Sequence, residues 1–446
     1  MAATVGLAVA LALPGLGTGR AAAQTFLRDA EIEATFKSLL APVANAAGLS
    51  PGRIDVVLLR DSSPNAFVVD SRHVFIHSGM VRRLDGPGEV QAVLAHELAH
   101  IANGHLARRP ANARRAGLLS GIGMALGVAL AAGGAGKAGA GVGAGVAGSA
   151  RNVFLGHTRA EEASADQSGL AFLAEAGGDP QAMVRVLEMF AGQEALSAPL
   201  QDPYVQTHPL NRDRLRRVRA YAAARGGGDG PDPALAKRFA RARAKLDAFL
   251  SSPSRTLARV GRRGSGDDSD AEIMARAVAL HRLPDAGAAI AEIDRLVARH
   301  PRDAYLHELR GQILLESRRV DAAVAAYRRA ARLAPKEPLI RAGLGRALLS
   351  VETTAATREA REALEAARAR APADPAMLRD LAVAYARLGE RGRASLVTAE
   401  RYALTGRIAT AATHARRAAG VLPRGSPGWL TAQDIIAMAE RQESRR

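Results

Sequence analysis

The sequence contains no cysteine and few aromatic residues. The absence of cysteine excludes disulfide bonds, cysteine-ligated zinc sites and cysteine nucleophiles together. Aromatic residues make up only 4% of the chain and do not alternate with basic runs, so binding of single-stranded nucleic acid by base stacking has little support. These absences narrow the function to classes that need neither cysteine chemistry nor base stacking.

Positive charge predominates, with a formal net charge of +17 over 446 residues. One interpretation is an anionic partner, such as nucleic acid or an acidic membrane surface. The other is a set of solvated helix faces, which the helical spacing of the arginines favours. We therefore expect no nucleic-acid partner. The length suits two or three domains, and a hydrophobic fraction of 48% can form their cores.

Residues 1–23 have the pattern of a secretory signal peptide. An apolar run covers 5–16, and three alanines at 21–23 offer a cleavage site before Gln24. No Lys or Arg precedes the apolar run, so the basic start of such a signal is missing. The alternative is an anchor that stays attached, but the run is too short to span a bilayer comfortably.

Residues 24–225 mix helical and strand patterns, as expected for an α+β domain. Apolar residues recur at helix spacing over 29–47. A strand is predicted over 54–59, and 66–69 with 74–76 predicts a β-hairpin. A helix over 88–106 follows the hairpin.

A hydrophobic Gly/Ala-rich segment over 117–150 interrupts this domain. Residues 117–136 carry no charge, and their glycines have the four-residue spacing that lets helices approach closely. We expect a helical hairpin that lies on the domain or contacts a membrane surface. The alternative is a transmembrane segment, which the length permits and the high glycine content disfavours.

The second half of this domain and the linker are predicted to be helical. Helices are expected over 159–176, 180–192 and 212–224, with a loop over 197–209. Residues 226–268 read as a linker with one connecting helix, because glycine and proline are frequent at its start.

Residues 269–446 are repetitive. The segments 288–301 (AAIAEIDRLVARHP) and 322–335 (AAVAAYRRAARLAP) are offset by one period of about 34 residues, and 359–372 follows them. Residues 410–423 are interpreted as the end of another copy. A helix pair with this period that ends in proline resembles the tetratricopeptide repeat, which stacks into an α-solenoid with a concave binding face.

The chemically decisive stretch is HELAH at 96–100. Because residues four apart share one face of a helix, His96 and His100 can each direct a ring nitrogen at one zinc ion. Glu97 lies beside them, where it can act as the general base toward a water molecule. The remaining positions of this helix are apolar, as expected for a buried active-site helix.

A third protein ligand is expected for zinc. One class of zinc peptidase places a histidine ten residues after the first, but Leu106 occupies that position, and His105 is expected to point away from the metal. A second class uses a glutamate on a later helix, which Glu162 can supply. Asp166, four residues on, can accept a hydrogen bond from a ligand histidine. Glu161 can instead be an acidic residue that favours the helix start.

These motifs resemble the zinc peptidase family that includes the CAAX prenyl protease, the heat-shock protease HtpX and the periplasmic protease BepA. The resemblance rests on 96–105 (HELAHIANGH), on Glu162 with Asp166, and on Asn65, Ala66 and Phe67. Together with the signal segment and the repeats, it points to the BepA-like branch. It implies a gluzincin fold with one Zn²⁺ per chain and an α-solenoid after it.

The same resemblance implies a function. A protein of this kind would be a periplasmic zinc endopeptidase that cleaves misfolded or stalled envelope proteins, in quality control of outer-membrane protein assembly. Its substrates would include unfolded outer-membrane proteins, and its repeats would contact the assembly machinery. The 65–67 segment would bind substrate backbone as an edge strand. The rival interpretation is a repeat-based chaperone or adaptor with latent proteolytic activity.

The resemblance also singles out His208, in the motif Thr207-His208-Pro209. In the BepA-like branch a histidine in such a loop can close over the zinc and restrain activity, so His208 would be a displaceable fourth ligand. The alternative is a loop histidine that merely packs. Tyr204, His157 and His208 are all candidates for the donor that stabilises a transition-state oxyanion.

Overall fold

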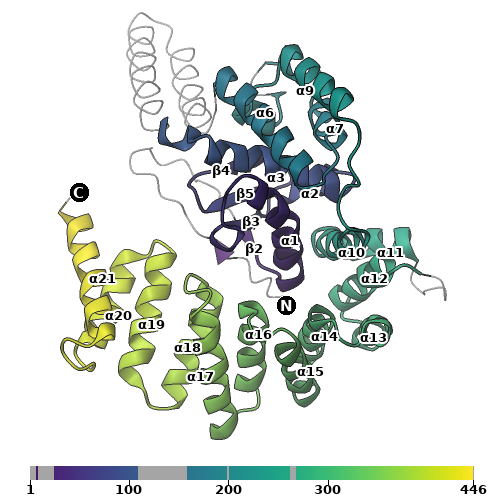
Figure 1. Cartoon of the computed structure of the whole chain (residues 1–446). Helices are drawn as coiled ribbons and strands as arrows, with labels where there is room; N and C mark the ends of the chain where they lie inside the picture. Colours follow the sequence, from purple (N-terminus) through teal and green to yellow (C-terminus); the bar gives the residue numbers. More distant parts are fainter. Residues whose placement is uncertain (1–6, 9–24, 109–157, 198–199, 262–267, 445–446) are drawn as a thin grey trace, which may run out of the picture. The chain divides into compact units, whose positions relative to one another are not determined.

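The structure is a computed structural model, and it describes residues 7–8, 25–108, 158–197, 200–261 and 268–444 (Figure 1). The described chain divides into two compact units. One unit runs from residue 32 to 243, and the other combines 25–31 with 244–444. The first unit holds the HELAH helix and the second holds the repeats.

A small sheet lies in the first unit. Its strands are β3 (Asp55–Leu59), β4 (Ala66–Val68) and β5 (His73–His77), in the spatial order β3-β5-β4. β4 and β5 pair antiparallel with Phe67 opposite Phe75, so the expected hairpin is confirmed. β3 runs parallel to β5. β4 therefore occupies the outer edge of the sheet, as expected for the 65–67 segment.

Helix α3 (Pro87–Ala102) carries the HELAH motif through the core of this unit. Pro87 stands in its first turn, where a missing N–H costs no helical hydrogen bond. The helix ends at Ala102 with Asn103 as its C-terminal capping residue, and Gly104 adopts a left-handed φ of 68°. The predicted helix over 88–106 was therefore too long, because this glycine turns the chain. A short 3-10 helix, η2 (His105–Arg108), follows the turn.

The remaining helices of this unit largely match their predictions. They are α1 (Ala30–Ala46, with its first residues in the other unit), α2 (Ser78–Arg83), α6 (Arg159–Glu175), α7 (Gln181–Met189) and α9 (Arg212–Arg225). α2 had no prediction. The predicted loop over 197–209 was wrong in part, because it contains the short helix α8 (Pro203–Thr207), which starts at a proline.

Two helices connect the units along the chain. α10 (Pro233–Leu250) was expected, whereas α11 (Pro253–Val260) replaces part of what the sequence predicted as a polar linker. Ser252 caps α11 by accepting a hydrogen bond from the Arg255 N–H. This Ser-Pro start was the signal that the sequence offered for the second helix.

The second unit contains five antiparallel helix pairs along the chain (Figure 1). They are α12 (Asp270–Arg282) with α13 (Ala286–Arg299), α14 (Ala304–Glu316) with α15 (Val320–Leu333), α16 (Pro338–Leu349) with α17 (Thr354–Arg368), α18 (Pro375–Arg387) with α19 (Arg391–Leu404), and α20 (Ile408–Ala419) with α21 (Pro427–Glu443). The expected solenoid of helix pairs is confirmed.

The interpretation of residues 410–423 as the end of another copy stays a prediction. α20 covers most of this segment and packs against α19 before it as well as against α21 after it. α19 had no prediction of its own, because Thr405 and Gly406 follow it instead of the proline that ends the earlier copies.

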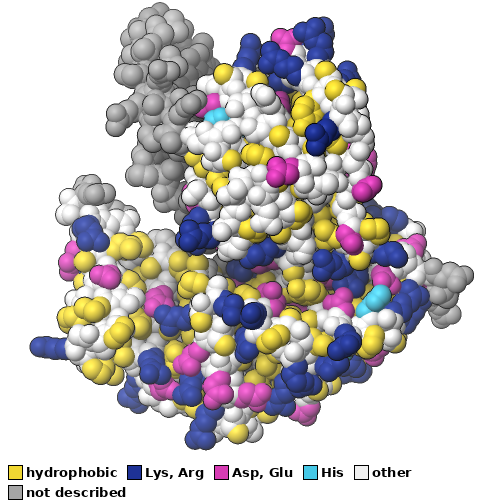
Figure 2. Space-filling model, in the orientation of Figure 1, with side chains coloured by type: hydrophobic (Ala, Val, Ile, Leu, Met, Phe, Trp, Pro, Cys, Tyr) yellow, Lys and Arg dark blue, Asp and Glu magenta, His cyan; other side chains and the backbone are white. Residues whose placement is uncertain are grey.

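Arginines link successive helix pairs of the solenoid. Arg328 pairs with Glu359, Arg361 with Glu390 and Arg368 with Glu400, at N–O distances of 2.6, 3.0 and 2.7 Å. In Figure 2 the Lys and Arg side chains on the visible face are dispersed among Asp and Glu. Part of the arginine content therefore serves contacts between repeats.

Two sequence expectations fall largely or wholly outside the described residues. The Gly/Ala-rich segment over 117–150 lies outside them, and so does most of the signal segment. Leu7–Ala8 form β1, which pairs antiparallel with β2 (Thr25–Leu27). Within the described ranges, no helix combines the length and the apolar character needed to cross a bilayer.

Candidate metal centre

The centre begins with the two histidines and the glutamate of α3. His96, Glu97 and His100 are all buried, because every residue of this helix from 89 to 100 is covered by neighbouring elements. One helical turn separates His96 from His100, and their Nε2 atoms lie 3.1 Å apart. The local helix alone therefore brings two ligand nitrogens to one point.

Helix α6 supplies the carboxylate. Thr158 and Glu161 form a capping box at its start, which confirms the role proposed for Glu161 and leaves Glu162 to face α3. Two turns further on, Gly169 packs so closely that a Cβ atom there would lie 3.2 Å from the backbone of Ala95 and His96. This close approach places Glu162 over the histidine pair.

The candidate ligand atoms lie at the corners of a small polyhedron, and the distances between them are its edges. The Glu162 oxygens lie 3.4 Å from His96 Nε2 and 3.3 Å from His100 Nε2. A tetrahedral zinc ion with bonds of about 2.0–2.1 Å has ligands separated by about 3.3–3.4 Å. These spacings, and a donor set of two imidazoles and a carboxylate, fit a tetrahedral metal ion.

His208 joins the same cluster from the end of α8. Its Nδ1 atom lies 3.2 Å from His96 Nε2 and 3.1 Å from Glu162 Oε1. One ligand atom from each of His96, His100, Glu162 and His208 lies within 4.8 Å of the others. The cluster could therefore hold a metal ion through side chains of these four residues.

Asp166 and Arg214 surround the ligands. Asp166 Oδ1 lies 3.1 Å from His96 Nδ1, the ring nitrogen that faces away from the cluster. Arg214 of α9 donates to both oxygens of Asp166 at 2.7 and 2.8 Å and lies 2.6 Å from Glu162. It also donates to the backbone carbonyls of His208 and Pro209. One buried guanidinium thus connects the carboxylates of α6 with the His208 loop.

His105 contacts the other ligand histidine. Its Nδ1 atom lies 3.0 Å from Nδ1 of His100, on the far side of the ring from the cluster. If His100 binds a metal through Nε2, its Nδ1 carries the proton and can donate to His105. Each α3 histidine therefore has its own partner at the outer ring nitrogen.

The electrostatics of the centre favour a positive charge. Burial opposes protonation of His96, but Glu162 and Asp166 outweigh it and raise its pKa to about 10. Burial and the nearby charges of His96 and His208 lower the pKa of His100 to about 3. Burial also opposes the charge of Glu162, but Arg214 and the histidines hold the pKa of that carboxyl well below its usual range.

The structure describes Tyr204 and His208 of the three candidates for an oxyanion donor. The Tyr204 ring stacks on His208 at 4.7 Å between centroids, and burial together with the charge of Glu97 raises the pKa of its phenol well above 10. Tyr204 is therefore a protonated donor next to the cluster. His157 lies outside the described residues.

The 203–208 segment also covers the edge strand. His208 Nε2 lies 3.1 Å from the carbonyl oxygen of Ala66, and the Tyr204 N–H donates to the Pro64 carbonyl at 3.3 Å. The Thr207 hydroxyl bonds the Asn65 side chain at 3.2 Å. The carbonyls that an added substrate strand would use are therefore engaged by the same segment that brings His208 to the cluster.

Comparison with known proteins agrees with this arrangement. Residues 27–222, which include the whole cluster, match the model of peptidase family M48. This segment is therefore similar to the peptidases of family M48. The family match therefore covers the sheet, the HELAH helix, the Glu162 helix and the His208 loop.

Three relatives extend the similarity. The beta-barrel assembly-enhancing protease of Yersinia pestis is 29% identical over 360 residues, which cover 79% of this chain and 72% of that protein. The protein of the same name from Escherichia coli K12 is 30% identical over 162 residues, covering 36% and 33%. A Vibrio cholerae relative is 30% identical over 214 residues, covering 43% and 44%. The chain thus spans less than half the length of two of these relatives.

A solved structure also resembles part of the chain. The protein MamA matches 38% of this chain and 97% of its own length, at 17% identity and a TM-score of 0.32. This similarity is too low to support any argument about function. The helix pairs of the second unit are established by the structure itself.

Sequence reasoning missed two contributors to the candidate metal centre. Arg214 stood in a helix that was described only as basic, and nothing in its spacing linked it to Asp166, 48 residues earlier. His105 was set aside because it could not be a direct ligand. The signal for His105 was its position just after Gly104, where the chain turns back toward α3.

Proposed function

We propose that this protein is a zinc-dependent endopeptidase with one Zn²⁺ ion per chain. The observation that carries the proposal is the buried cluster of His96, His100 and Glu162 with tetrahedral spacing, directly beside Glu97. The match of residues 27–222 to peptidase family M48 supports the same conclusion. A peptidase of this kind requires both features together, a metal-binding centre and an adjacent general base.

In this proposal His96, His100 and Glu162 are the permanent ligands. A bound zinc ion would supply Lewis acidity that polarises the scissile carbonyl. Glu97 takes the proton of the attacking water and returns it to the leaving amine. Asp166 and His105 orient the two ligand imidazoles, since each contacts the Nδ1 atom of one of them.

Substrate is proposed to bind along β4 by strand addition. β4 is the edge of its sheet, and the outward carbonyl of Ala66 is next to the metal cluster because His208 contacts both. A substrate strand that pairs with residues 65–67 would place its own backbone beside Glu97. Recognition through the backbone would suit unfolded polypeptides of varied sequence.

His208 is proposed to restrain this activity. Its two ring nitrogens contact Glu162 and the Ala66 carbonyl, so one side chain fills both the fourth ligand position and the edge strand. Moving the 203–208 segment would free the two sites in one step. The closed arrangement is therefore proposed to be the resting form.

The biological setting is proposed from the names of the relatives and from the signal segment. We propose a periplasmic enzyme that cleaves misfolded or stalled envelope proteins during outer-membrane protein assembly. Its substrates would include unfolded outer-membrane proteins, and the five helix pairs would bind these or the assembly machinery. Residues 117–150 would contact the membrane surface.

One observation favours a second candidate. Because His208 fills the fourth position, the protein could act mainly as a repeat-based chaperone or adaptor whose proteolysis is latent. The two candidates differ in whether the closed centre opens during normal function. Both keep the same metal ligands.

The first test is cleavage of casein by the purified mature protein, with zinc content measured on the same samples. The controls are Glu97→Gln, which keeps the ligands, and His208→Ala, which opens the fourth position. Cleavage by the wild type or by His208→Ala, with none by Glu97→Gln, would support the peptidase. Cleavage that survives in Glu97→Gln, or a protein that binds no zinc, would overturn it. Zinc binding without cleavage in any sample would favour the adaptor.

A further inference from the structure

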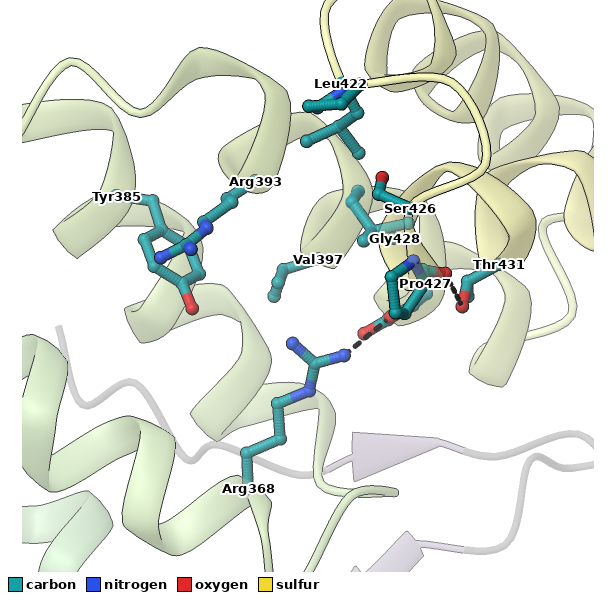
Figure 3. Close-up of a pocket in the computed structure, with 12 residues that line it drawn as sticks. Arg368, Tyr385, Arg393, Val397, Leu422, Ser426, Pro427, Gly428 and Thr431 are labelled. Atoms are coloured by element: carbon teal, nitrogen blue, oxygen red, sulfur yellow. Dashed lines mark hydrogen bonds and ion pairs between the residues drawn. The ribbon is translucent and has the colours of Figure 1, made fainter.

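The second unit contains a pocket of about 440 Å³, which is lined by residues between 368 and 431 in the C-terminal helix pairs. It is formed by the end of α17, by α18 and α19, and by the loop that leads into α21 (Figure 3). Its size is in the range of small-ligand and peptide subsites. None of the residues that line it belongs to the segment that matches family M48.

One side of the pocket is basic. Arg368 and Arg393 both line the pocket; Arg368 extends toward Val397, and the Arg393 guanidinium lies over the Tyr385 ring (Figure 3). In the described part of the chain, Arg368 hydrogen-bonds Glu400 through one Nη atom and Arg393 hydrogen-bonds Glu390 through one Nη atom. A guanidinium carries five N–H donors, so each arginine keeps donors for a ligand.

The arginines are also held in place. Arg393 lies over the Tyr385 ring, 5.8 Å from its centroid, and Tyr385 in turn donates its hydroxyl to Glu365. Arg368 is fixed by its 2.7 Å bond to Glu400. Guanidinium groups with one fixed partner lose less freedom when they bind a second anion.

The other side of the pocket is apolar. It is lined by Leu396, Val397, Leu422 and Pro427. Leu422 is confined, because a Cβ atom added at Gly392 would lie 2.9 Å from it, and one added at Gly428 would lie 3.3 Å from it. Leu422 is therefore packed closely against the backbone of both glycines.

The charges that face the pocket favour an anion. Arg368 and Arg393 oppose one acidic lining residue, Glu400. Burial raises the pKa of Glu400 although Arg368 opposes this effect. Gly428 lies in the first turn of α21, where backbone N–H groups have no acceptor within the helix. The surroundings are thus positive on one side and apolar on the other.

We propose that this pocket binds the C-terminal residue of a polypeptide whose last side chain is apolar. The terminal carboxylate and the last side chain leave the same carbon atom, so a single residue presents an anion and an apolar group in adjacent directions. Arg368 and Arg393 would hold the carboxylate by charge-assisted hydrogen bonds. Val397 and Leu422 would contact the side chain. This inference goes beyond the proposed peptidase and does not depend on its activity.

The test is binding of a fluorescein-labelled octapeptide of glycine and serine that ends in Val-Leu with a free carboxylate. Fluorescence anisotropy is measured with the full chain carrying Glu97→Gln, so that the probe is not cut. The comparison probe is the same peptide with a C-terminal amide. A third probe is amidated and carries an internal aspartate before the leucine.

The free carboxylate should bind at least about tenfold more tightly than the amide, because the amide loses the charge-assisted bonds. Arg368→Gln and Arg393→Gln should each weaken binding by about tenfold. Arg328→Gln is the matched control, since Arg328 makes an equivalent ion pair with Glu359 away from the pocket, and it should leave binding unchanged.

Four outcomes would overturn the inference. Equal binding of the acid and the amide would show that the carboxylate is not recognised, whatever the variants do. Equal weakening by Arg328→Gln would indicate a general effect of net charge. Tight binding of the internal aspartate probe would assign the pocket to acidic side chains instead of chain ends. Absence of binding by the free acid up to millimolar concentration would also contradict it.

Discussion

The Nδ1 atoms of His100 and His105 lie 3.0 Å apart, on the side of the His100 ring that faces away from the metal cluster. His105 is buried, and it follows the left-handed turn at Gly104. A ligand imidazole that donates its outer N–H is fixed in tautomer and orientation. His105 therefore completes the support of the α3 ligands, in the same way as Asp166 supports His96.

Replacing His105 tests this support directly. His105→Leu removes the acceptor and should lower zinc affinity by about 10- to 100-fold, whereas His105→Gln, which keeps an acceptor, should retain more of it. Affinity is measured by competition with a chromophoric chelator, which requires no peptidase activity. His73→Leu serves as the control, because His73 is bonded to Asp70 at the surface. Equal zinc affinity of the wild type and His105→Leu would refute the role.

Opening the fourth ligand position should raise proteolysis. His208→Ala removes the contacts with Glu162 and the Ala66 carbonyl. If closure is worth about 1.4 kcal/mol, cleavage of casein should rise about tenfold at unchanged zinc content. His307→Ala, which alters an exposed histidine of the repeats, should have no effect. Unchanged or lower cleavage with zinc retained would show that His208 does not restrain the enzyme.

Arg214 should be the most sensitive residue of the centre for stability. Arg214→Met leaves the buried carboxylates of Glu162 and Asp166 without their cation, so the first unit should lose about 3–5 kcal/mol of stability in the metal-free protein. Arg214→Lys should lose less but cannot restore the bidentate contact. Thermal unfolding with chelator present measures the effect.

A matched arginine provides the control for that experiment. Arg219 lies on the same helix and pairs with Glu188 at the surface, where both side chains are about half exposed. Arg219→Met should therefore change stability by less than about 1 kcal/mol. Similar losses of stability for Arg214→Met and Arg219→Met would show that burial of the Arg214 ion pairs does not increase their contribution to stability.

The stability of the second unit should depend on pH through the titration of Glu308. Burial raises the pKa of this carboxyl to about 7, although Lys245, 3.6 Å away, opposes the rise, and Asp29 and Glu31 add to it. The folded protein then keeps the proton in a range where the unfolded chain has released it. Stability therefore falls as the pH rises from about 4.5 to 7.

Glu308→Gln should remove this fall in stability with rising pH. Relative to the variant, the wild type should lose on the order of 1–3 kcal/mol between pH 4.5 and 7.5. Unfolding of the repeats by urea at several pH values measures the difference. Glu359→Gln is the control, because Arg328 lowers the pKa of the Glu359 carboxyl, and a lowered pKa gives no fall in stability as the pH rises through this window. Parallel pH profiles for the wild type and Glu308→Gln would exclude the effect.

Much of the centre followed from local sequence because its geometry is local. His96 and His100 share a helix face by their spacing, and the capping box of Thr158 and Glu161 is a pattern of four residues. The hairpin was predictable because alternating apolar residues flank a short turn. Helix ends were less predictable, since α3 ends at Ala102, just before the left-handed turn at Gly104.

The repeats show the same division. Five helix pairs carry one common pattern of small and apolar residues, but α19 lacked the proline that marks the earlier copies and was passed over. The pocket beside Arg368 and Arg393 could not be predicted, because its walls come from four different helices and the loop before α21. Packing between successive pairs, and not a motif, creates it.

The sequence by itself determined the helix that carries His96, Glu97 and His100, the choice of Glu162 as the acidic partner, and the solenoid of helix pairs. Each depends on the period of a helix or on a short motif, which acts over a few residues. Only the tertiary structure decided that Arg214 joins Asp166 to the His208 loop and that His105 supports His100. It also decided that His208 contacts both the metal cluster and the edge strand β4. Those contacts arise from burial of charged and polar groups between distant segments, whose partners are chosen by packing and not by spacing along the chain.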